Sequence, residues 1–316
     1  MKLRLISKYR SCLMALAMLW VAIRHSNFPI NFKPLKFLLY SCGYGGVDAF
    51  LFLSGFGIYY ALKKEPVYGE FVKRRCLRIL PYSIATAAIM FLLGRRTLND
   101  ALVEGLGLVV WLRQAWAQWY TSFILFLYLL TPLYFSFFKK KPLAVTTITI
   151  AAVFLLCQFL NDRNVYIFFR TGIYVLGIYF GYLNETKPEL DCWWLPLLTI
   201  AGFALMFWLF HYVNNDTMYT QPFLLIIPGM LLFAAWCLDQ LRFLQRPLVT
   251  MAPYTFQFYL IHEEVVAYLY SLYAVLYRPG IYFDYLINIV AIVLAFGLAI
   301  VLKKAVDLIL VRIVRN

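Results

Sequence analysis

Ten runs of mainly apolar residues divide this chain, and each run is about as long as a helix that crosses a lipid bilayer. Such a helix needs about 20 apolar residues to cross a hydrocarbon layer of about 30 Å. We therefore predict an all-α fold, a polytopic integral membrane bundle of about ten transmembrane helices. The predicted spans are 8–27, 44–62, 77–94, 118–137, 142–160, 165–183, 193–212, 221–239, 252–276 and 281–303. The apolar stretch 101–113 is too short for an eleventh span and is interpreted as an interfacial or re-entrant segment.

The composition excludes a soluble globular protein. Hydrophobic residues make up 63% of the 316 residues, and charged residues only 14%, whereas a soluble domain is typically about a quarter charged. A compact globule cannot hide so much apolar surface and still present a polar exterior to water. No linker, low-complexity tract or internal repeat divides the sequence, so we predict a single transmembrane domain over residues 1–316.

The net charge of +14 could suggest a nucleic-acid partner, but the positions of the basic residues favour a membrane explanation. With the N-terminus inside, twenty lysines and arginines fall on the inner side and eight on the outer side. Basic residues concentrate in cytoplasmic loops. We therefore predict cytoplasmic N- and C-termini, contact with membrane lipid and no nucleic-acid partner. No small-residue cleavage site follows the first apolar run, so we expect it to remain as a span.

The six cysteines are scattered, without a CxxC pair or a nearby histidine. Their spacing therefore indicates neither a disulfide framework nor a metal site. We expect no metal and no permanently bound cofactor.

A few ionisable residues fall inside predicted spans, where such groups are costly and usually face a cavity. Histidine accepts and releases protons near neutral pH, so the histidines His25 and His262 are candidates for proton chemistry. The alternative interpretation of His25 is a non-functional interfacial histidine shielded by lipid headgroups. The other buried ionisable candidates are Asp48, Arg170, Glu263 and Glu264.

A basic cluster precedes the third predicted span. Its members are Lys73, Arg74, Arg75 and Arg78. One interpretation is a topology signal or contact with anionic lipid. The other is a phosphate site, because arginines three or four residues apart share a helix face and guanidinium groups bind phosphate with two hydrogen bonds.

A glycine-rich stretch, 43–57, opens the second predicted span. It lacks the spacing of a nucleotide-binding loop. Ser54, Gly55 and Gly57 instead suggest close helix contact, and Asp48 could cap a helix.

Several blocks, taken in order, resemble the acyltransferase-3 family of bacterial membrane O-acyltransferases. The segment 13–25 resembles the family's first helix, which ends in a histidine. The segment Gly46-Val-Asp-Ala-Phe-Leu-Phe-Leu-Ser-Gly-Phe56 is similar to its GVDxFFxLSGF signature, and Tyr254-Thr-Phe-Gln-Phe-Tyr-Leu-Ile-His262 to its late YSxYLxH block. Further matching blocks are Arg75-Cys-Leu-Arg-Ile-Leu-Pro81, Trp119-Tyr with Leu130-Thr-Pro132, and Arg170 with Gly177 and Gly181.

The sequence departs from the family at one position. The family's first helix usually has an arginine eleven residues before the histidine, where this chain has Met14. Arg10, one turn earlier on the same helix face, is the obvious substitute.

The resemblance implies transfer of an acyl group, most often acetyl, from acyl-CoA to a hydroxyl of a cell-envelope carbohydrate, in the bacterial inner membrane. His25 would act as general base or brief nucleophile, Asp48 would orient it, and Arg170 would stabilise the oxyanion. Residues expected to bind substrate are Arg10, Arg74, Arg75, Arg78, Ser54, Trp119, Tyr259 and His262.

Two other functions fit the predicted spans. A transporter or flippase of a lipid-linked saccharide would also use buried charges, and a structural membrane subunit would tolerate their substitution. The sequence identifies neither the acceptor sugar nor the acyl chain, and it does not indicate an oligomeric state.

Overall fold

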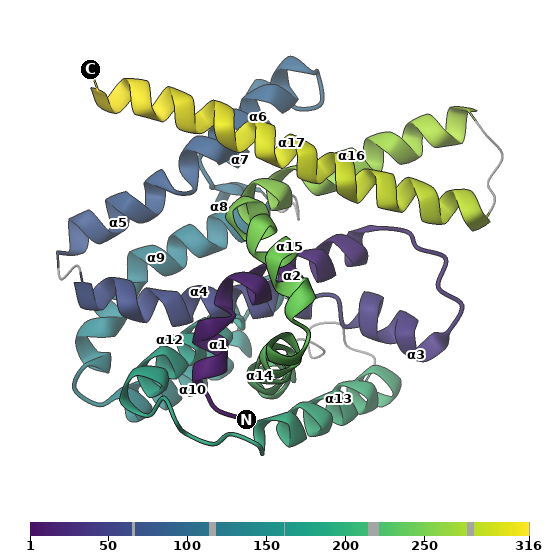
Figure 1. The fold of residues 1–316 in the computed structure, drawn as a ribbon. Helices are drawn as coiled ribbons and strands as arrows, with labels where there is room; N and C mark the ends of the chain where they lie inside the picture. Colours follow the sequence, from purple (N-terminus) through teal and green to yellow (C-terminus); the bar gives the residue numbers. More distant parts are fainter. Residues whose placement is uncertain (65–66, 114–117, 161, 214–220, 277–280, 316) are drawn as a thin grey trace. The chain divides into compact units, whose positions relative to one another are not determined.

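Helices account for almost all of the regular structure in this computed structural model (Figure 1). The structure describes residues 1–64, 67–113, 118–160, 162–213, 221–276 and 281–315. Within these ranges no strand forms, and the only bridge of strand type joins Lys2 to Asp191. The predicted all-α class is therefore confirmed for the described residues.

The helices follow one another through the chain with short connections. In order they are α1 (Arg4–Lys8), α2 (Arg10–His25), α3 (Lys33–Lys36), α4 (Gly45–Lys64), α5 (Tyr68–Leu77), α6 (Leu80–Leu92), α7 (Leu98–Gly105), α8 (Val109–Leu112), α9 (Trp119–Phe138), α10 (Pro142–Cys157), α11 (Asp162–Phe168), α12 (Thr171–Thr186), α13 (Leu195–Tyr212), α14 (Phe223–Gln240), α15 (Gln245–Met251), α16 (Thr255–Leu276) and α17 (Ile281–Arg315). A π-helical turn, Phe37–Ser41, follows α3. Single 3-10 turns flank α15.

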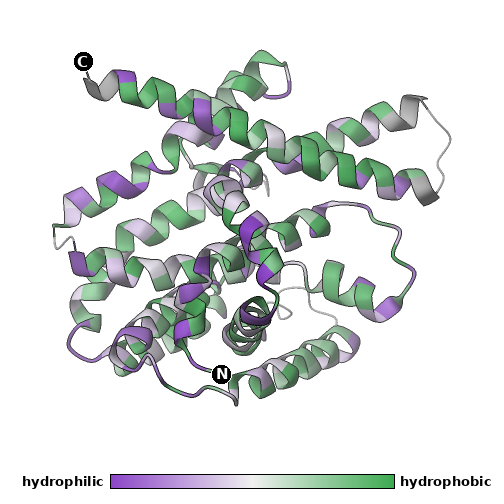
Figure 2. Ribbon diagram, viewed as in Figure 1, coloured by the Kyte–Doolittle hydropathy of each residue, from purple (hydrophilic) through white to green (hydrophobic). Residues whose placement is uncertain are grey.

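Seven helical segments in the described part of the chain are long and apolar enough to cross a membrane. They are Gly45–Lys64, Tyr68–Leu92, Trp119–Phe138, Asn164–Thr186, Leu195–Tyr212, Phe223–Gln240 and Phe283–Arg312. Large hydrophobic side chains are exposed along α13 and α17, as lipid contact requires, and hydrophobic residues dominate both helices (Figure 2). The chain is therefore a multi-pass membrane protein.

Each of the ten predicted spans contains a helix, but three of these helices are too short or too polar to be assigned as membrane-crossing helices. Helices α2 and α10 have only 16 residues each, and α16 carries His262, Glu263 and Glu264 in its interior. The count of ten and the cytoplasmic termini therefore stay predictions. The stretch 101–113 forms parts of two short helices, α7 and α8, separated by Gly107 in the left-handed backbone region (φ 68°), so it is not a span.

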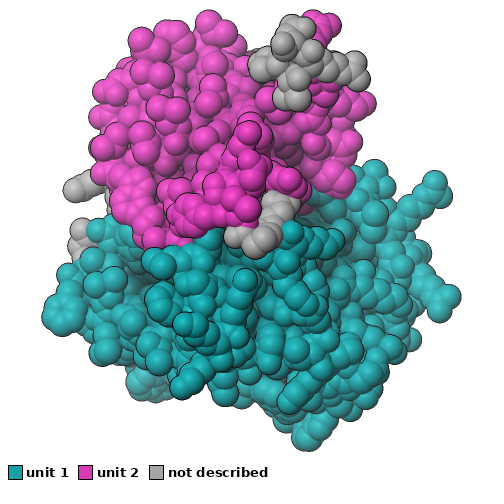
Figure 3. Space-filling model, turned by 90° about the vertical axis from the view of Figure 1, so that its left-hand side faces the viewer, with its two compact units in different colours: residues 1–21, 42–66, 131–252 teal, residues 22–41, 67–130, 253–316 magenta. Residues whose placement is uncertain are grey.

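The chain divides into two compact units (Figure 3). The first unit comprises residues 1–21, 42–66 and 131–252, and the second comprises residues 22–41, 67–130 and 253–316. The prediction of one domain over residues 1–316 stays a prediction.

Close contact between α4 and α12 builds the centre of the first unit. Gly55 of α4 lies against the backbone carbonyl of Tyr174, and Gly177 of α12 lies against the carbonyl of Phe52, so that a Cβ at either glycine would collide with backbone. Glycines allow two membrane helices to approach this closely. The contact predicted for the small residues of the second span is thus confirmed at Gly55.

The second unit is built around the pairing of α16 with α17, with α6 and α7 packed together beside them. Ala291, Ala295 and Ala299 recur every four residues along α17 and are fully buried. Residues spaced by four lie on one helix face, so these alanines form a smooth stripe against which neighbouring helices pack. This pairing fixes the position of α16, which carries Tyr259, His262, Glu263 and Glu264.

Candidate functional site

Three ionisable side chains from two distant parts of the sequence meet in the second unit. His25, the last residue of α2, has its Nδ1 atom 3.1 Å from Oε1 of Glu263 on α16. The His25 and His262 rings meet edge to face, with their centroids 5.1 Å apart. The side chains of His25 and Glu263 are 41% and 49% exposed, whereas His262 is 1% exposed. A buried imidazole therefore lies next to an accessible imidazole–carboxylate pair.

The sequence of α16 places its polar residues on one face. Tyr259, His262 and Glu263 are separated by three and four residues, and such residues are neighbours on a helix surface. Nδ1 of His262 lies 2.8 Å from the backbone carbonyl of Tyr259, and a carbonyl can only accept a hydrogen bond. The proton of neutral His262 is therefore on Nδ1. Its Nε2 atom is buried and has no hydrogen-bond partner among the described residues.

The end of α2 is held in place by a buried asparagine. The backbone N–H of Asn27 donates to Oδ1 of Asn288 at 3.0 Å, and Nδ2 of Asn288 donates to the hydroxyl of Tyr270 at 2.8 Å. Asn288 lies on α17 and is fully buried. This chain of bonds ties the residue two positions after His25 to both α16 and α17, so it fixes where the imidazole leaves α2.

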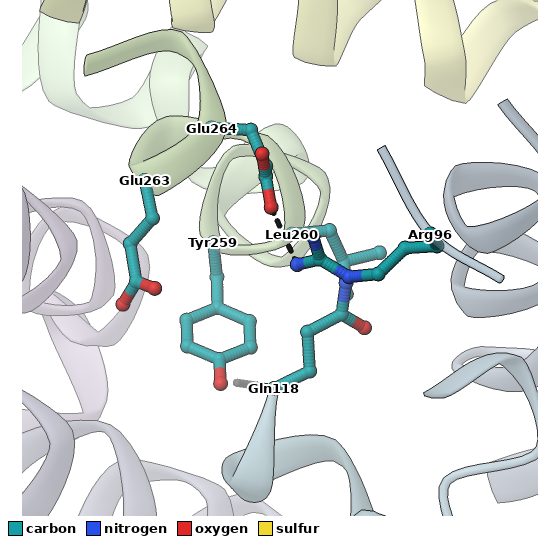
Figure 4. Close-up of a pocket in the computed structure, with 6 residues that line it drawn as sticks. All are labelled: Arg96, Gln118, Tyr259, Leu260, Glu263 and Glu264. Carbon is teal, nitrogen blue, oxygen red and sulfur yellow. Dashed lines mark hydrogen bonds and ion pairs between the residues drawn. The ribbon is translucent and has the colours of Figure 1, made fainter. Parts of the chain in front are cut away.

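A small pocket opens to solvent beside this cluster, with about 300 Å³ of empty volume when the adjoining open solvent is included. Its lining residues are Arg96, Gln118, Tyr259, Leu260, Glu263 and Glu264. Figure 4 shows Tyr259, Glu263 and Glu264 projecting from α16, with Arg96 facing Glu264 and Gln118 reaching toward Arg96. Gln118 has a left-handed backbone conformation (φ 50°), which is uncommon outside glycine and tends to occur at functional sites. The pocket thus combines carboxylates, an amide, a guanidinium and an aromatic ring.

Arg96 holds the pocket wall together through two ion pairs. Its Nε atom lies 2.8 Å from Glu104 and its NH2 atom 2.6 Å from Glu264. Burial raises the pKa of Glu104, and the hydrogen bond from Arg96 opposes that rise. The two carboxylates raise the pKa of Arg96 although its own burial acts the other way. One guanidinium therefore links the α7 segment to α16.

A comparison with known protein families matches residues 12–303 to a family model described as an acyltransferase domain. The chain belongs to the acyltransferase-3 family. The resemblance predicted from the sequence blocks is thereby confirmed, and the chain is a membrane acyltransferase. Comparisons with curated proteins and with solved structures found no match.

Asp48 and Arg170, predicted as catalytic in this acyltransferase-3 chain, lie in the first unit as a buried ion pair. Nε of Arg170 is 3.1 Å from Oδ1 of Asp48, and both side chains are almost completely buried. The guanidinium carbon also lies 4.1 Å from the ring centroid of Tyr166, and NH1 donates to the carbonyl of the same residue. The orienting role predicted for Asp48 and the oxyanion role predicted for Arg170 stay predictions.

Arg10, the substitute proposed for the family's arginine, also lies in the first unit. Its Nε atom donates to the backbone carbonyl of Leu53 at 3.0 Å. Its guanidinium occupies the space over Gly57, where a Cβ would collide with it. Ser54, next to Leu53, is buried. Gly57 therefore makes room for the side chain of Arg10.

The basic cluster lies in the second unit, and its arginines differ in how exposed they are. Arg74 and Arg78 are exposed at the C-terminal end of α5. Arg75 is half-buried, with its guanidinium carbon 5.4 Å from the ring centroid of Phe71 and 5.7 Å from that of Tyr128. Two of the three arginines are thus accessible to an anionic ligand, while Arg75 packs on aromatic rings.

Two aromatic residues predicted to bind substrate, Tyr259 and Trp119, both pack against Tyr120. The Tyr259 ring packs edge to face on Tyr120, with centroids 5.2 Å apart. Trp119, at the start of α9, contacts Tyr120 and Phe123. Among the predicted substrate-binding residues of the second unit, the structure brings Tyr259 and His262 together with His25.

Sequence reasoning did not select Glu263 as a partner of His25, nor Arg96, Glu104, Gln118 and Glu264 as pocket residues. For Glu263, a signal was present: it lies next to His262 and four residues after Tyr259 on one helix face. Arg96 is one of the eight basic residues that the sequence assigns to the outer side of the membrane. No local pattern distinguishes Glu104 or Gln118, because tertiary contacts alone bring them to the pocket.

Proposed function

We propose that this acyltransferase transfers an acyl group, acetyl by preference, from acyl-CoA to a hydroxyl group of a cell-envelope carbohydrate in the bacterial inner membrane. The observation that carries the proposal is the His25–Glu263 pair, an accessible imidazole beside a carboxylate and next to a polar pocket. A histidine oriented by a carboxylate is a recurrent general base in acyl transfer.

The pair supplies the base in the following way. The carboxylate of Glu263 favours a proton on Nδ1 of His25, which leaves the lone pair on Nε2 to accept the proton of the acceptor hydroxyl. The hydroxyl oxygen attacks the thioester carbonyl, and the C–S bond breaks. The imidazolium then returns its proton to the departing CoA thiolate, so that an ester and free CoA result. The Glu263 charge stabilises the imidazolium between these two steps.

The pocket offers hydrogen-bonding groups to a hydroxyl of the carbohydrate acceptor. Glu263, Glu264 and the amide oxygen of Gln118 can accept hydrogen bonds from sugar hydroxyls, and Tyr259 offers a ring surface. Oε1 of Gln118 is buried without a hydrogen-bond partner among the described residues. A bound hydroxyl would satisfy it.

For the donor, the exposed Arg74 and Arg78 are suited to the phosphates of acyl-CoA, while Arg75 packs on aromatic rings. Guanidinium groups form charge-assisted, two-pronged hydrogen bonds with phosphate. Arg10 is proposed as a further donor contact in the first unit. This assignment predicts that salt weakens donor binding more than acceptor binding.

The test uses the full chain, purified and reconstituted in lipid nanodiscs, with acetyl-CoA and an envelope carbohydrate fraction. Release of free CoA thiol measures turnover, and thermal unfolding checks the fold. Because general base catalysis contributes about 10²–10⁴-fold, His25→Ala is expected to lower turnover by at least about 100-fold. His211→Ala is the matched control, since His211 is exposed and bonds to a carbonyl of its own helix.

Turnover in His25→Ala within about twofold of the wild type would remove the catalytic assignment. The rival function, movement of a lipid-linked saccharide, predicts acceptor flux across a vesicle membrane with no release of CoA thiol. An acyl-imidazole intermediate on His25, the alternative to direct transfer, predicts a burst of thiol release in the absence of acceptor.

A further inference from the structure

We infer that His25, His262 and Glu263 form a binding site for a divalent transition-metal ion with the ligand preference of zinc. One ligand atom from each of the three side chains lies within 4.8 Å of the other two. Two imidazole nitrogens and a carboxylate oxygen are a ligand set that zinc uses, with a further position left open. All three residues belong to the second unit.

His262 is already arranged as a metal ligand. Its Nδ1–H donates to the backbone carbonyl of Tyr259 at 2.8 Å, which is the outer contact that usually orients a metal-bound histidine. Its Nε2 lone pair is buried and has no hydrogen-bond partner within the described ranges. Stacking on Phe258, with centroids 5.5 Å apart, fixes the ring. A buried acceptor without a partner is unfavourable, and a metal ion would satisfy it.

His25 and Glu263 supply the other two ligands. Their closest atoms are 3.1 Å apart, and the ligand atoms of a tetrahedral zinc ion are separated by about 3.3 Å. The pair therefore already has the spacing of two ligands on one ion. Both side chains are partly exposed, so they have the rotamer freedom to close on the fixed Nε2 of His262. Their exposure also gives an ion a path to the site.

Metal binding at this site has a consequence for acyl transfer, and this part rests on the proposed function. A bound ion takes up the Glu263 carboxylate and a lone pair of the His25 ring, and its positive charge disfavours a second positive charge on that ring. The imidazole can then no longer collect a proton from the acceptor. Zinc is therefore expected to inhibit transfer, and a chelator to restore it.

The binding test uses the full chain in nanodiscs, stripped with a chelator and titrated with Zn²⁺ by calorimetry and with Co²⁺ by visible absorption. One ion per chain is expected, with the absorption of tetrahedral Co²⁺. Glu263→Gln, at a partly exposed position, and His262→Ala should each weaken binding at least tenfold. His211→Ala should bind as the wild type does, since that histidine lies on α13. Absence of saturable binding, or wild-type affinity in both Glu263→Gln and His262→Ala, would overturn the site.

Measuring acyl transfer with and without zinc distinguishes failure of the metal site from failure of the proposed function. Acyl transfer by the metal-free chain without any zinc binding overturns the metal site and leaves the proposed function intact. Zinc binding without acyl transfer in any metal state supports the site and overturns the proposed function. Transfer that requires the ion would contradict the expected inhibition and, with it, the role of His25 as a free base.

Discussion

The two units of the molecule each contain a group of ionisable side chains among apolar helices, and the two groups differ in how far their side chains are exposed. In the first unit, Asp48 and Arg170 neutralise each other and are completely buried. In the second unit, His25 and Glu263 keep nearly half of their side-chain surface exposed. His262 beside them retains a buried nitrogen without a hydrogen-bond partner in the described part of the chain.

We expect this difference in exposure to distinguish an ion pair that stabilises the fold from a pair that takes part in chemistry. A completely buried ion pair is not accessible to a substrate, and its energy depends on both partners being present. An accessible imidazole with an oriented carboxylate has a lone pair to offer and a route for a reactant. From sequence alone both groups count equally as ionisable residues inside spans, although their environments suit different tasks.

The largest expected effect is on the stability of the first unit. Arg170→Met leaves the Asp48 carboxylate buried without its partner, and removal of one member of a buried pair costs about 3–5 kcal/mol. We expect the variant to lose folded protein at temperatures where the wild type is intact. The measurement is unfolding of the detergent-solubilised chain, followed by fluorescence-detected size exclusion after heating.

The double variant Asp48→Asn/Arg170→Met tests whether the pair is only structural. Because it removes both charges together, it should recover most of the lost stability. Recovery of stability together with activity supports a structural pair. Recovery of stability without activity would instead support the catalytic roles predicted for Asp48 and Arg170, and would break the contrast between the two units.

The sequence predicted the helices well because a long apolar run in lipid has few alternatives to a helix. Each of the ten runs contains a helix, from α2 to α17. The order of degenerate blocks predicted the family, since the matched region extends over residues 12–303. Boundaries were less predictable: the third predicted span begins within α5, and a break before Leu80 separates that helix from α6.

The candidate site was predictable only in part. His25, His262 and Tyr259 were identified because polar residues stand out in apolar runs. The partner of His25 was not, since Glu263 reaches it through the packing of α16 in the second unit, far along the chain. Arg96 has the local character of a topology charge, and only the structure shows that it joins two carboxylates.

The second largest effect is expected on catalysis in the second unit. Glu263→Gln keeps the shape of the side chain but removes the charge that orients and stabilises the His25 imidazole. We expect a loss in kcat of about 10–100-fold, at the low end of general base effects, with an unchanged unfolding temperature because Glu263 is partly exposed. Steady-state thiol release measures it.

Glu189→Gln is the matched control for this variant. Glu189 is an exposed carboxylate whose ion pair, with Arg4, lies at the surface of the first unit. It should change neither activity nor stability measurably, since surface ion pairs contribute little. A loss in Glu263→Gln no larger than that of Glu189→Gln would show that the carboxylate does not assist His25.

A smaller effect, with a distinctive pH dependence, is expected at the pocket wall. Arg96→Met removes the partner of the buried Glu104, at a cost of about 1–2 kcal/mol. Burial then raises the pKa of Glu104 without opposition from Arg96. When the pKa of a carboxyl is raised in the folded state, the folded protein becomes less stable as pH increases above the unfolded pKa of that carboxyl, about 4.3. The deficit relative to wild type should therefore be larger at pH 7 than at pH 4.5.

Unfolding curves at the two pH values measure this deficit, and Arg96→Met/Glu104→Gln should abolish its pH dependence because the titrating group is gone. A deficit that is equal at both pH values would mean that Glu104 does not carry the effect. Because the Arg96 guanidinium also holds Glu264, a moderate rise in KM for the acceptor is expected to accompany the loss of stability.

The smallest effect is expected at Arg10, the proposed acyl-CoA contact in the first unit. Gly57→Ala introduces a methyl group where the guanidinium of Arg10 now lies. The end of that side chain is flexible and can move aside, so stability should change little. If Arg10 contacts the donor, KM for acyl-CoA should rise about two- to fivefold with kcat unchanged, as expected when a uniform binding contact is weakened. Gly297→Ala is the control, because a Cβ there meets no atom within 4 Å. Equal kinetic constants in the two variants would place Arg10 outside donor binding and leave its bond to the Leu53 carbonyl as a purely structural contact.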